Sequence, residues 1–319
     1  MENNSLHKLG IDIGSTTVKI ALLDADDNIL FSDYERHFAN IQETLESLIR
    51  KAYDKTGDLS VCPMITGSGG LTLAKHLEVP FVQEVIAVST ALTHYAPQTD
   101  VAIELGGEDA KILFLGRHFD ARMNDSCAGG TGAFIDQMAS LLNVETPQMN
   151  ELAQQAQNTY TIASRCGVFA KSDIQPLLNE GAKKEDIAAS VFQAVVMQTI
   201  SGLACGRPIR GNVAFLGGPL QYLSELRHRF YVTLNLDEEH RIVPQNAHLF
   251  VASGAAMAHE SNKLSTFPQL IEAIDALGDT QGAEVERLDP LFATDEDFAD
   301  YEVQQYTLPE GELRDEAVW

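Results

Sequence analysis

Alternating apolar and polar positions open the chain, which is the pattern of half-buried strands. Residues 8–13, 18–24 and 29–35 form three such segments, separated by the turn sequences GSTT and DADDN. Apolar residues then recur at helical spacing over 41–55. A strand over 61–66 and a helix over 84–96 follow, so this opening part of the chain is predicted to form one unit of strands and helices.

The strand pattern then restarts, with segments over 101–105, 110–116 and 118–124. In both copies a strand ends in a carboxylate and a glycine follows two residues later, at Asp12 and at Glu104. A strand–turn–strand unit that occurs twice indicates an internal repeat. A buried strand is expected later, over 211–218. Helices are expected over 131–143, 147–158, 173–180, 185–204, 219–230, 247–260 and 266–277.

At about 100–200 residues per domain, the length of the chain suggests two domains. The first domain is expected over 1–98 and the second over 99–280, with the helix at about 247–260 able to return to the first. No periodicity persists beyond this point, and 281–319 is predicted to be an acidic linker or tail.

Charge is concentrated in that tail. The 319 residues include 22 Lys+Arg and 46 Asp+Glu, which gives a formal net charge of −24. Residues 284–319 hold twelve acidic residues and two Arg, or −10 of that total. Nucleic-acid and anionic-membrane partners need clustered cations, so neither is expected. Because no apolar signal region opens the chain and no stretch approaches about 20 apolar residues, a cytoplasmic location is predicted.

The two glycine turns carry candidate chemistry. In DIGSTTVK, backbone N–H groups at Gly14, the hydroxyls of Ser15–Thr17 and the cation of Lys19 can surround an anion, while Asp12 can hold Mg²⁺ through water. ELGGEDAK repeats this design from Glu104 onward. Taken alone, either sequence could equally be a plain hairpin turn that binds nothing. Neither turn is a Walker A loop, and neither opens a helix as a Rossmann turn does.

A third glycine turn, Gly217-Gly218, lies between a strand and a helix that begins with Pro219. In their order and spacing the three turns resemble those of the actin, sugar kinase and heat-shock-protein-70 ATPase superfamily, over about residues 8–260. The resemblance implies an actin-like fold with ATP in a cleft between two α/β domains. It implies that Asp12 and Glu104 organise Mg²⁺ and the attacking water. It assigns the nucleotide to Gly14, Ser15, Thr16, Thr17, Lys19, Gly106, Gly107, Glu108, Gly130, Thr131, Gly217, Gly218, Gln221 and His248.

Two of the four cysteines begin helix-prone segments, Cys127 in NDSCAGGTGAF and Cys166 in SRCGVFAKSD. A position at the start of a helix favours the thiolate form. Cys62 and Cys205 are predicted to be small buried residues, and the spacing speaks against a zinc site. Two thiolates cannot hold a four-iron cluster, but two chains on a two-fold axis supply four. The alternative is that Cys127 and Cys166 are two unrelated thiols that happen to begin helices.

The cysteine motifs resemble those of the BadF/BadG/BcrA/BcrD ATPase family, which includes activators of 2-hydroxyacyl-CoA dehydratases. That resemblance implies a homodimeric ATPase with one 4Fe-4S cluster per homodimer, bound by Cys127 and Cys166 of both chains. It implies ferredoxin or flavodoxin as electron donor and an iron–sulfur dehydratase or reductase as acceptor. Four positions depart from the family pattern: Glu104, Lys171, His248 and Val251. The GGPLQYLSEL form resembles large multidomain relatives, so the chain is predicted to be an N-terminal module.

Two alternatives stay open. A small-molecule kinase of the amino-sugar type would share the ATPase fold and would need an aspartate base. Asp109 and Asp125 are candidates for that base, but a kinase gives no reason for the two cysteine motifs. A nucleotide-regulated interaction module that has lost the cluster is the other alternative, and the intact Cys127 and Cys166 argue against it.

Overall fold

The computed structural model describes residues 6–116, 118–124, 127–258 and 264–277, together with 292, 294, 297–299 and 301. Residues Met1–Leu277 form one compact unit, and Gly278–Trp319 form a second. Most of the predicted tail, 281–319, therefore lies outside the described residues. The predicted boundary near residue 98 divides the first unit into two and stays a prediction.

A five-stranded sheet begins the first unit, with strand order β10-β4-β1-β2-β3. Its central strand β1 (His7–Ile13) pairs antiparallel with β2 (Thr17–Leu23) and parallel with β4 (Ser60–Thr66). At its edges lie β3 (Ile29–Arg36) and β10 (Ser265–Thr266). Side chains alternate between the two faces of a strand. Leu9, Ile11 and Ile13 accordingly share a core with α1 (Ile41–Thr56) and α11 (Phe267–Ala276).

The second sheet has the equivalent strand order, β7-β6-β5-β8-β9, but its last strand β9 is parallel to β8, whereas β10 is antiparallel to β4. Here β5 (Val101–Leu105) pairs antiparallel with β6 (Ala110–Phe114) and parallel with β8 (Val213–Leu216). The edges are β7 (Asp120–Met123) and β9 (Arg241–Ile242). The equivalent pairing of β1 and β5 confirms the internal repeat predicted from the two glycine turns.

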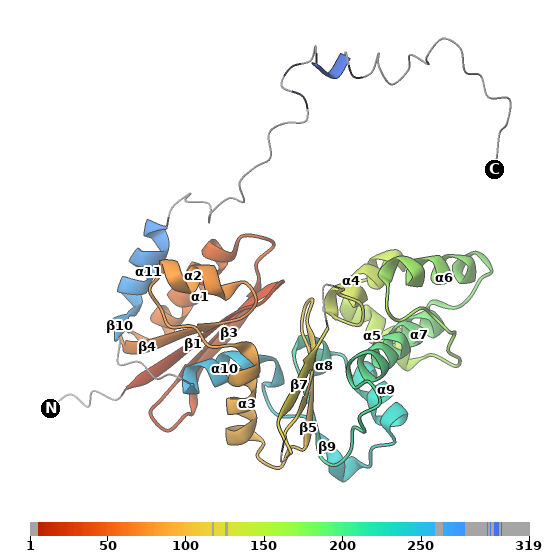
Figure 1. Cartoon of the computed structure of the whole chain (residues 1–319), viewed down its shortest axis with the longest axis horizontal. Helices are drawn as coiled ribbons and strands as arrows, with labels where there is room; N and C mark the ends of the chain where they lie inside the picture. Colours follow the sequence, from red (N-terminus) through yellow and green to blue (C-terminus); the bar gives the residue numbers. More distant parts are fainter. Residues whose placement is uncertain are drawn as a thin grey trace. The chain divides into compact units, whose positions relative to one another are not determined.

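Helices from the middle of the chain cover one face of the second sheet (Figure 1). The long apolar segment predicted over 185–204 is α7 (Lys184–Met197) followed by a π-helical stretch, Gln198–Leu203. Contrary to the expectation from sequence, Lys184–Leu203 is long and apolar enough to cross a membrane, but most of it is buried within the fold. The other helices are α4 (Gly132–Leu141), α5 (Thr146–Gln154), α6 (Gly167–Asn179), α8 (Gly218–Tyr222) and α9 (Ser224–Leu234).

Several boundaries differ from those predicted. The short helix α2 (Gly70–His76) was not predicted from the sequence. The helix predicted over 219–230 is divided into α8 and α9, since Leu223 has a non-helical backbone. The helix predicted over 173–180 starts earlier, at Gly167. Helix α2 was missed because its seven residues form too few turns for helical periodicity to be recognised in the sequence.

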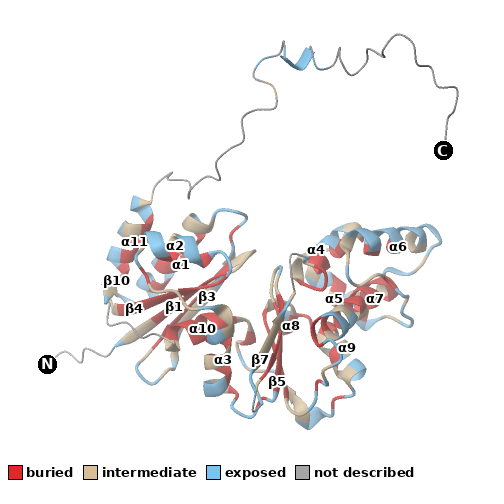
Figure 2. Cartoon of the chain, in the orientation of Figure 1, coloured by how far each residue is buried: buried red, intermediate tan, exposed pale blue. Residues whose placement is uncertain are grey.

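Two helices, α3 (Glu84–Tyr95) and α10 (Phe250–Met257), contribute to one hydrophobic cluster with β5, β6 and β8. Helix α10 also lies against the first sheet, and it is almost entirely buried (Figure 2). A Cβ atom added at Gly10 of β1 would lie 1.8 Å from the Ala252 carbonyl oxygen. A Cβ atom added at Gly254 would lie 1.7 Å from the Ala87 oxygen of α3. Glycine therefore allows α10 to contact β1 and α3 backbone to backbone.

We expect Gly254→Ala to destabilise the protein by about 1–3 kcal/mol or more, because the added methyl group meets backbone that cannot rotate away. Urea unfolding measures the effect. Gly116→Ala is the control, since nothing lies within 4 Å of its added Cβ atom. Equal unfolding free energies for the two variants would contradict the close contact.

Candidate functional site

The two glycine hairpins meet at their turns. A Cβ atom added at Gly107 in the β5–β6 turn would lie 2.2 Å from Thr16 Oγ1 in the β1–β2 turn. Strand register places Asp12 opposite Lys19 in the first hairpin and Glu104 opposite Lys111 in the second. Each turn thus carries a carboxylate and a lysine at matching positions.

The first pair is a buried ion pair. Asp12 is 2% exposed, and its Oδ2 lies 2.6 Å from Lys19 Nζ. Burial acts to lower the pKa of Lys19, but the attraction of the Asp12 carboxylate outweighs it and the pKa is raised. Lys19 therefore stays charged and balances Asp12 at the floor of the site.

The second pair leaves one carboxylate oxygen free to bind a ligand. Lys111 Nζ lies 2.5 Å from Glu84 Oε2 and 3.6 Å from Glu104 Oε1. Within the described residues, Glu104 Oε2 is buried and accepts no hydrogen bond. Burial raises the pKa of Glu104, and the charge of Lys111 offsets this only in part. An unpartnered, buried carboxylate oxygen at the edge of a cavity fits an Mg²⁺ ion held directly or through water.

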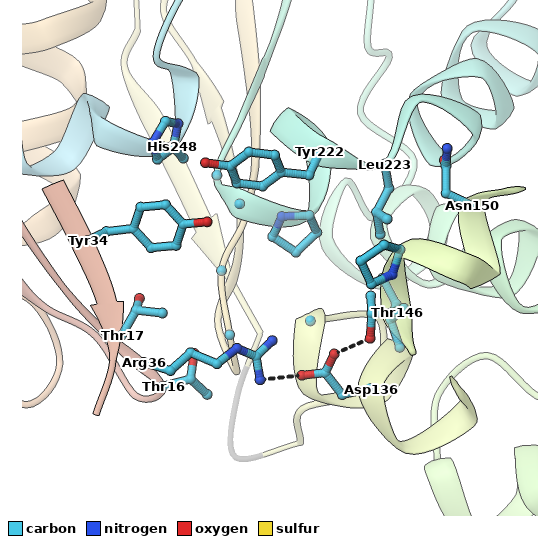
Figure 3. Close-up of a pocket in the computed structure, with 18 of the residues that line it drawn as sticks. Thr16, Thr17, Tyr34, Arg36, Asp136, Thr146, Asn150, Tyr222, Leu223 and His248 are labelled. Atoms are coloured by element: carbon cyan, nitrogen blue, oxygen red, sulfur yellow. Dashed lines mark hydrogen bonds and ion pairs between the residues drawn. The ribbon is translucent and has the colours of Figure 1, made fainter. Parts of the chain in front are cut away.

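Between these hairpins and the helices on the second sheet lies a cavity of about 580 Å³ (Figure 3). Nine residues predicted from sequence to bind nucleotide or metal line it: Thr16, Thr17, Lys19, Glu104, Gly106, Gly107, Gly217, Gly218 and His248. The structure thus brings all three glycine turns to one cavity.

Gly217 explains how the third turn reaches the other two. Its φ is +89°, and an added Cβ atom would lie 2.0 Å from the Leu105 carbonyl oxygen. Only glycine adopts this conformation readily and leaves room for that contact. The β8–α8 turn therefore lies against the end of β5, next to Gly106.

Other predicted residues lie behind the lining. Asp12 is buried beneath Lys19, and Gly14 closes the first turn through its N–H to Thr17 O, at 2.9 Å. Ser15 Oγ lies 3.2 Å from Ser68 Oγ. The Gln221 side chain accepts a hydrogen bond from Ala247 N at 3.1 Å, so it braces the third turn.

Three more predicted residues also fall outside the lining. Glu108 is exposed. Gly130 lies against Gln198, and Thr131 is wholly buried, with its hydroxyl donating to Ala128 O. The backbone of Gly132 reaches the cavity instead of these two residues.

Sequence reasoning missed several polar and aromatic lining residues. Tyr34 and Arg36 of β3 lie opposite Lys19 and Thr17 in the strand register, so they face the same cavity. Arg36 forms an ion pair of 2.9 Å with Asp136 of α4 (Figure 3). Alternation along β3 alone does not distinguish a cavity-facing residue from a solvent-facing one. The pairing of β3 with β2, which places Tyr34 opposite Lys19, could have identified these two residues as cavity-facing.

Aromatic rings gather at the other end of the cavity. The ring centroids of Tyr34 and Tyr222 are 6.0 Å apart, and His248 lies 5.2 Å from Tyr34 and 5.4 Å from Tyr222 (Figure 3). Aromatic pairs at this spacing attract each other beyond simple burial. The three rings form one wall of the cavity from β3, α8 and the segment before α10.

The two motif cysteines are neighbours at the surface. Cys127 is exposed and Cys166 is partly exposed. Cys127 Sγ donates a hydrogen bond to Arg165 O at 3.1 Å, and a Cβ atom added at Gly129 would lie 2.2 Å from that same oxygen. Cys166 occupies the N-cap position of α6, so it begins a helix as predicted, although its side chain makes no capping hydrogen bond. Cys127 does not begin a helix, because glycines separate it from α4, which starts at Gly132.

The remaining cysteines differ from each other. Cys62 is buried as predicted, and burial raises the pKa of its thiol. Cys205 is exposed, contrary to the prediction, because the chain leaves its helix there with a φ of +47°. In the part of the chain that the structure describes, the one cluster with metal-ligand spacing is Asp237, Glu239 and His240, and it includes no cysteine.

His248 gives the site a measurable pH dependence. Burial, together with the charge of Lys19, lowers the pKa of His248 to about 4. Between about pH 6.5 and pH 4 the unfolded chain binds a proton at this residue that the folded chain does not. Stability therefore decreases as pH falls through this window. We expect His248→Asn to lose less unfolding free energy than the wild type between pH 7 and pH 5 in urea titrations. Equal losses would contradict the lowered pKa.

Comparison with known proteins places this site in context. The model of the BadF/BadG/BcrA/BcrD ATPase family matches residues 9–258. The activator of 2-hydroxyisocaproyl-CoA dehydratase from Clostridioides difficile is 33% identical, over 67% of this chain and 81% of the relative.

Solved structures agree. Component A of the (R)-2-hydroxyglutaryl-CoA dehydratase of Acidaminococcus fermentans superposes with a TM-score of 0.69 at 26% identity, covering 79% of this chain and 97% of that one. The activator of 2-hydroxyisocaproyl-CoA dehydratase from Clostridium difficile, with bound ADPNP, gives 0.67 at 28% identity, covering 89% and 100%. The predicted α/β, actin-like ATPase fold is thereby confirmed, and the chain belongs to the BadF/BadG/BcrA/BcrD ATPase family.

Proposed function

We propose that the chain is an ATPase that drives single electrons at low potential to a partner 2-hydroxyacyl-CoA dehydratase or a related reductase. One observation carries the proposal: the cavity at the three glycine turns is connected through the start of α4 to a surface with two accessible cysteines. Relatives are named as dehydratase activators, and a solved relative holds ADPNP.

The cavity supplies what nucleotide hydrolysis requires. Phosphoryl transfer is catalysed mainly by positioning and by electrostatic stabilisation. The backbone N–H of Gly107 and the hydroxyls of Thr16 and Thr17 can hold the phosphates of ATP or ADP, and Gly106, whose N–H is donated to Asp109 O, leaves room for them. Asp12 and the free oxygen of Glu104 would hold Mg²⁺ and orient the attacking water. His248, with its lowered pKa, would meet the nucleotide as a neutral ring.

The cysteines fit an iron–sulfur cluster shared between two chains. One chain presents Cys127 and Cys166 at one surface, and four thiolates are needed for a 4Fe-4S cluster. A two-fold homodimer would bring together the four thiols from both copies. The cluster, when bound, would accept and release one electron, taken from ferredoxin or flavodoxin and passed to the partner iron–sulfur protein.

Backbone contacts connect the two regions. Gly132 N donates to Gly106 O at 3.0 Å, and Ala133 N donates to Gly107 O at 2.7 Å. The first turn of α4 is therefore hydrogen-bonded to the Gly106–Gly107 turn, where we propose that the phosphates bind. A nucleotide that changes this turn would shift α4 and the cysteine segment before it, and hydrolysis would reverse the shift.

Among the described residues, nothing favours the kinase alternative. Asp109 is absent from the residues that line the cavity, and its carbonyl oxygen accepts the Gly106 N–H within the turn. Asp125 lies outside the described residues. The cysteine surface would also have no role in phosphorylating a small hydroxyl compound.

Glu104→Gln tests the hydrolytic site. Removing the charge while keeping the shape should lower the ATPase rate constant by about 100-fold or more, since the metal and the water lose their anionic ligand. Calorimetry should still detect ADP binding, and the melting temperature should not fall, because Lys111 keeps Glu84 as partner. An unchanged rate in the phosphate-release assay would exclude Glu104 from catalysis.

Cysteine replacement tests the electron-transfer part. Anaerobically reconstituted wild type should form a dimer with about four irons, measured by light scattering and iron analysis. Cys127→Ser and Cys166→Ser should lose the iron and the activation of the partner. Cys205→Ser is the matched control, because this thiol is also exposed and is expected to bind no iron. A kinase would keep its activity in all three variants, and iron retained in Cys127→Ser would contradict the proposed ligand set.

A further inference from the structure

The side chain of Asn124 joins the second glycine turn to Cys127. Its Oδ1 accepts the Ala110 N–H at 2.7 Å, and its Nδ2 donates to Glu108 O at 2.8 Å and to Cys127 O at 2.9 Å. Its own N–H donates to Ala110 O at 3.0 Å. One amide group is thus shared by the turn and by the cysteine segment.

We propose that Asn124 is a positioning residue that transmits nucleotide occupancy of the Gly106–Asp109 turn to Cys127. The inference rests on the proposed function, since it requires that a nucleotide bind at this turn. It adds a specific side chain to that function, whereas the contacts of Gly132 and Ala133 are made by backbone alone.

The geometry of the turn explains how the signal would be carried. Gly106 and Gly107 line the cavity, and Glu108 O and Ala110 N lie just beyond them on the same tight turn. Gly106 N donates to Asp109 O at 2.7 Å, so the turn is closed across this point. A phosphate bound to the Gly107 N–H would fix the orientation of that peptide group, and the neighbouring peptide groups would adjust with it. Both groups that Asn124 contacts in the turn are among those neighbours.

The path continues from Asn124 to the second cysteine. Asn124 holds the Cys127 carbonyl, and the Cys127 thiol donates to Arg165 O, one residue before Cys166. Gly129 packs directly against the same Arg165 oxygen. When Asn124 fixes the position of Cys127, the contacts of Cys127 and Gly129 with Arg165 O also fix the segment that carries Cys166.

Asn124→Asp separates this role from general support of the fold. Aspartate has the same shape and keeps an acceptor for the Ala110 N–H. In place of the amide donor it presents an oxygen, which cannot donate to Glu108 O or Cys127 O and is repelled by both carbonyls. The variant should fold, since Asn124 is only partly buried, and its link to Cys127 should be lost.

Thiol alkylation of the cluster-free protein is the test. Iodoacetamide labelling, resolved by peptide mass spectrometry, measures Cys127, Cys166 and Cys205 separately, with and without Mg-ADP. In wild type we expect Mg-ADP to slow labelling of Cys127 by about fivefold or more, the lower end of usual coupling between sites. In Asn124→Asp the labelling rate of Cys127 should be the same with and without Mg-ADP. Cys205 is the internal control, and its rate should not change.

Calorimetry on both proteins distinguishes the possible failures. Mg-ADP binding to wild type without any change at Cys127 overturns the inference and leaves the proposed function standing. A nucleotide effect of equal size in Asn124→Asp also overturns it, because the transmission would then run through backbone alone. Absence of Mg-ADP binding to wild type overturns the proposed function and the inference together.

Discussion

The site depends on placing two carboxylates inside the protein without leaving them uncompensated. Burying an unpaired carboxylate costs far more than most side-chain contacts return. Strand register solves this twice, since the antiparallel partner of each central strand places a lysine opposite the carboxylate. The two ion pairs differ. Asp12 forms a close ion pair with Lys19, whereas Lys111 lies closer to Glu84 than to Glu104. The less compensated carboxylate is the one with a free oxygen, and it lines the cavity.

The strongly acidic composition does not prevent the cavity from binding an anion. A net charge of −24 would repel a polyphosphate if side-chain charge alone decided binding. Lys19, which lines the cavity, is already paired with Asp12, so an anion there would be met by backbone N–H groups and hydroxyls. Arg36 also lines the cavity, and because its side chain is half-exposed, its ion pair with the partly buried Asp136 is screened by solvent and is more easily exchanged for another anion.

Local patterns were sufficient to predict the repeat, the three turns and the cavity residues within them. Each turn joins elements whose periodicity and glycine content are visible in a few residues. Tyr34, Arg36, Tyr222 and Asp136 were not predicted, because their role depends on which strand or helix lies opposite, and that is a tertiary contact. The exposure of Cys205 was missed for a related reason, since it follows from the φ of one residue after a π-helical turn. Helix α2 was not predicted because its seven residues are too few for helical periodicity to be recognised.

The glycine contacts of α10 have a mechanical consequence. Side chains between two elements can change rotamer and absorb a small displacement, but carbonyl groups in direct contact have no such freedom. At Gly10 and Gly254 the backbone of helix α10 lies directly against that of β1 on one side and that of α3 on the other. β1 carries Asp12, and α3 carries Glu84, the partner of Lys111 in the second hairpin. The two hairpins are stiffly linked behind the cavity as well as at their turns.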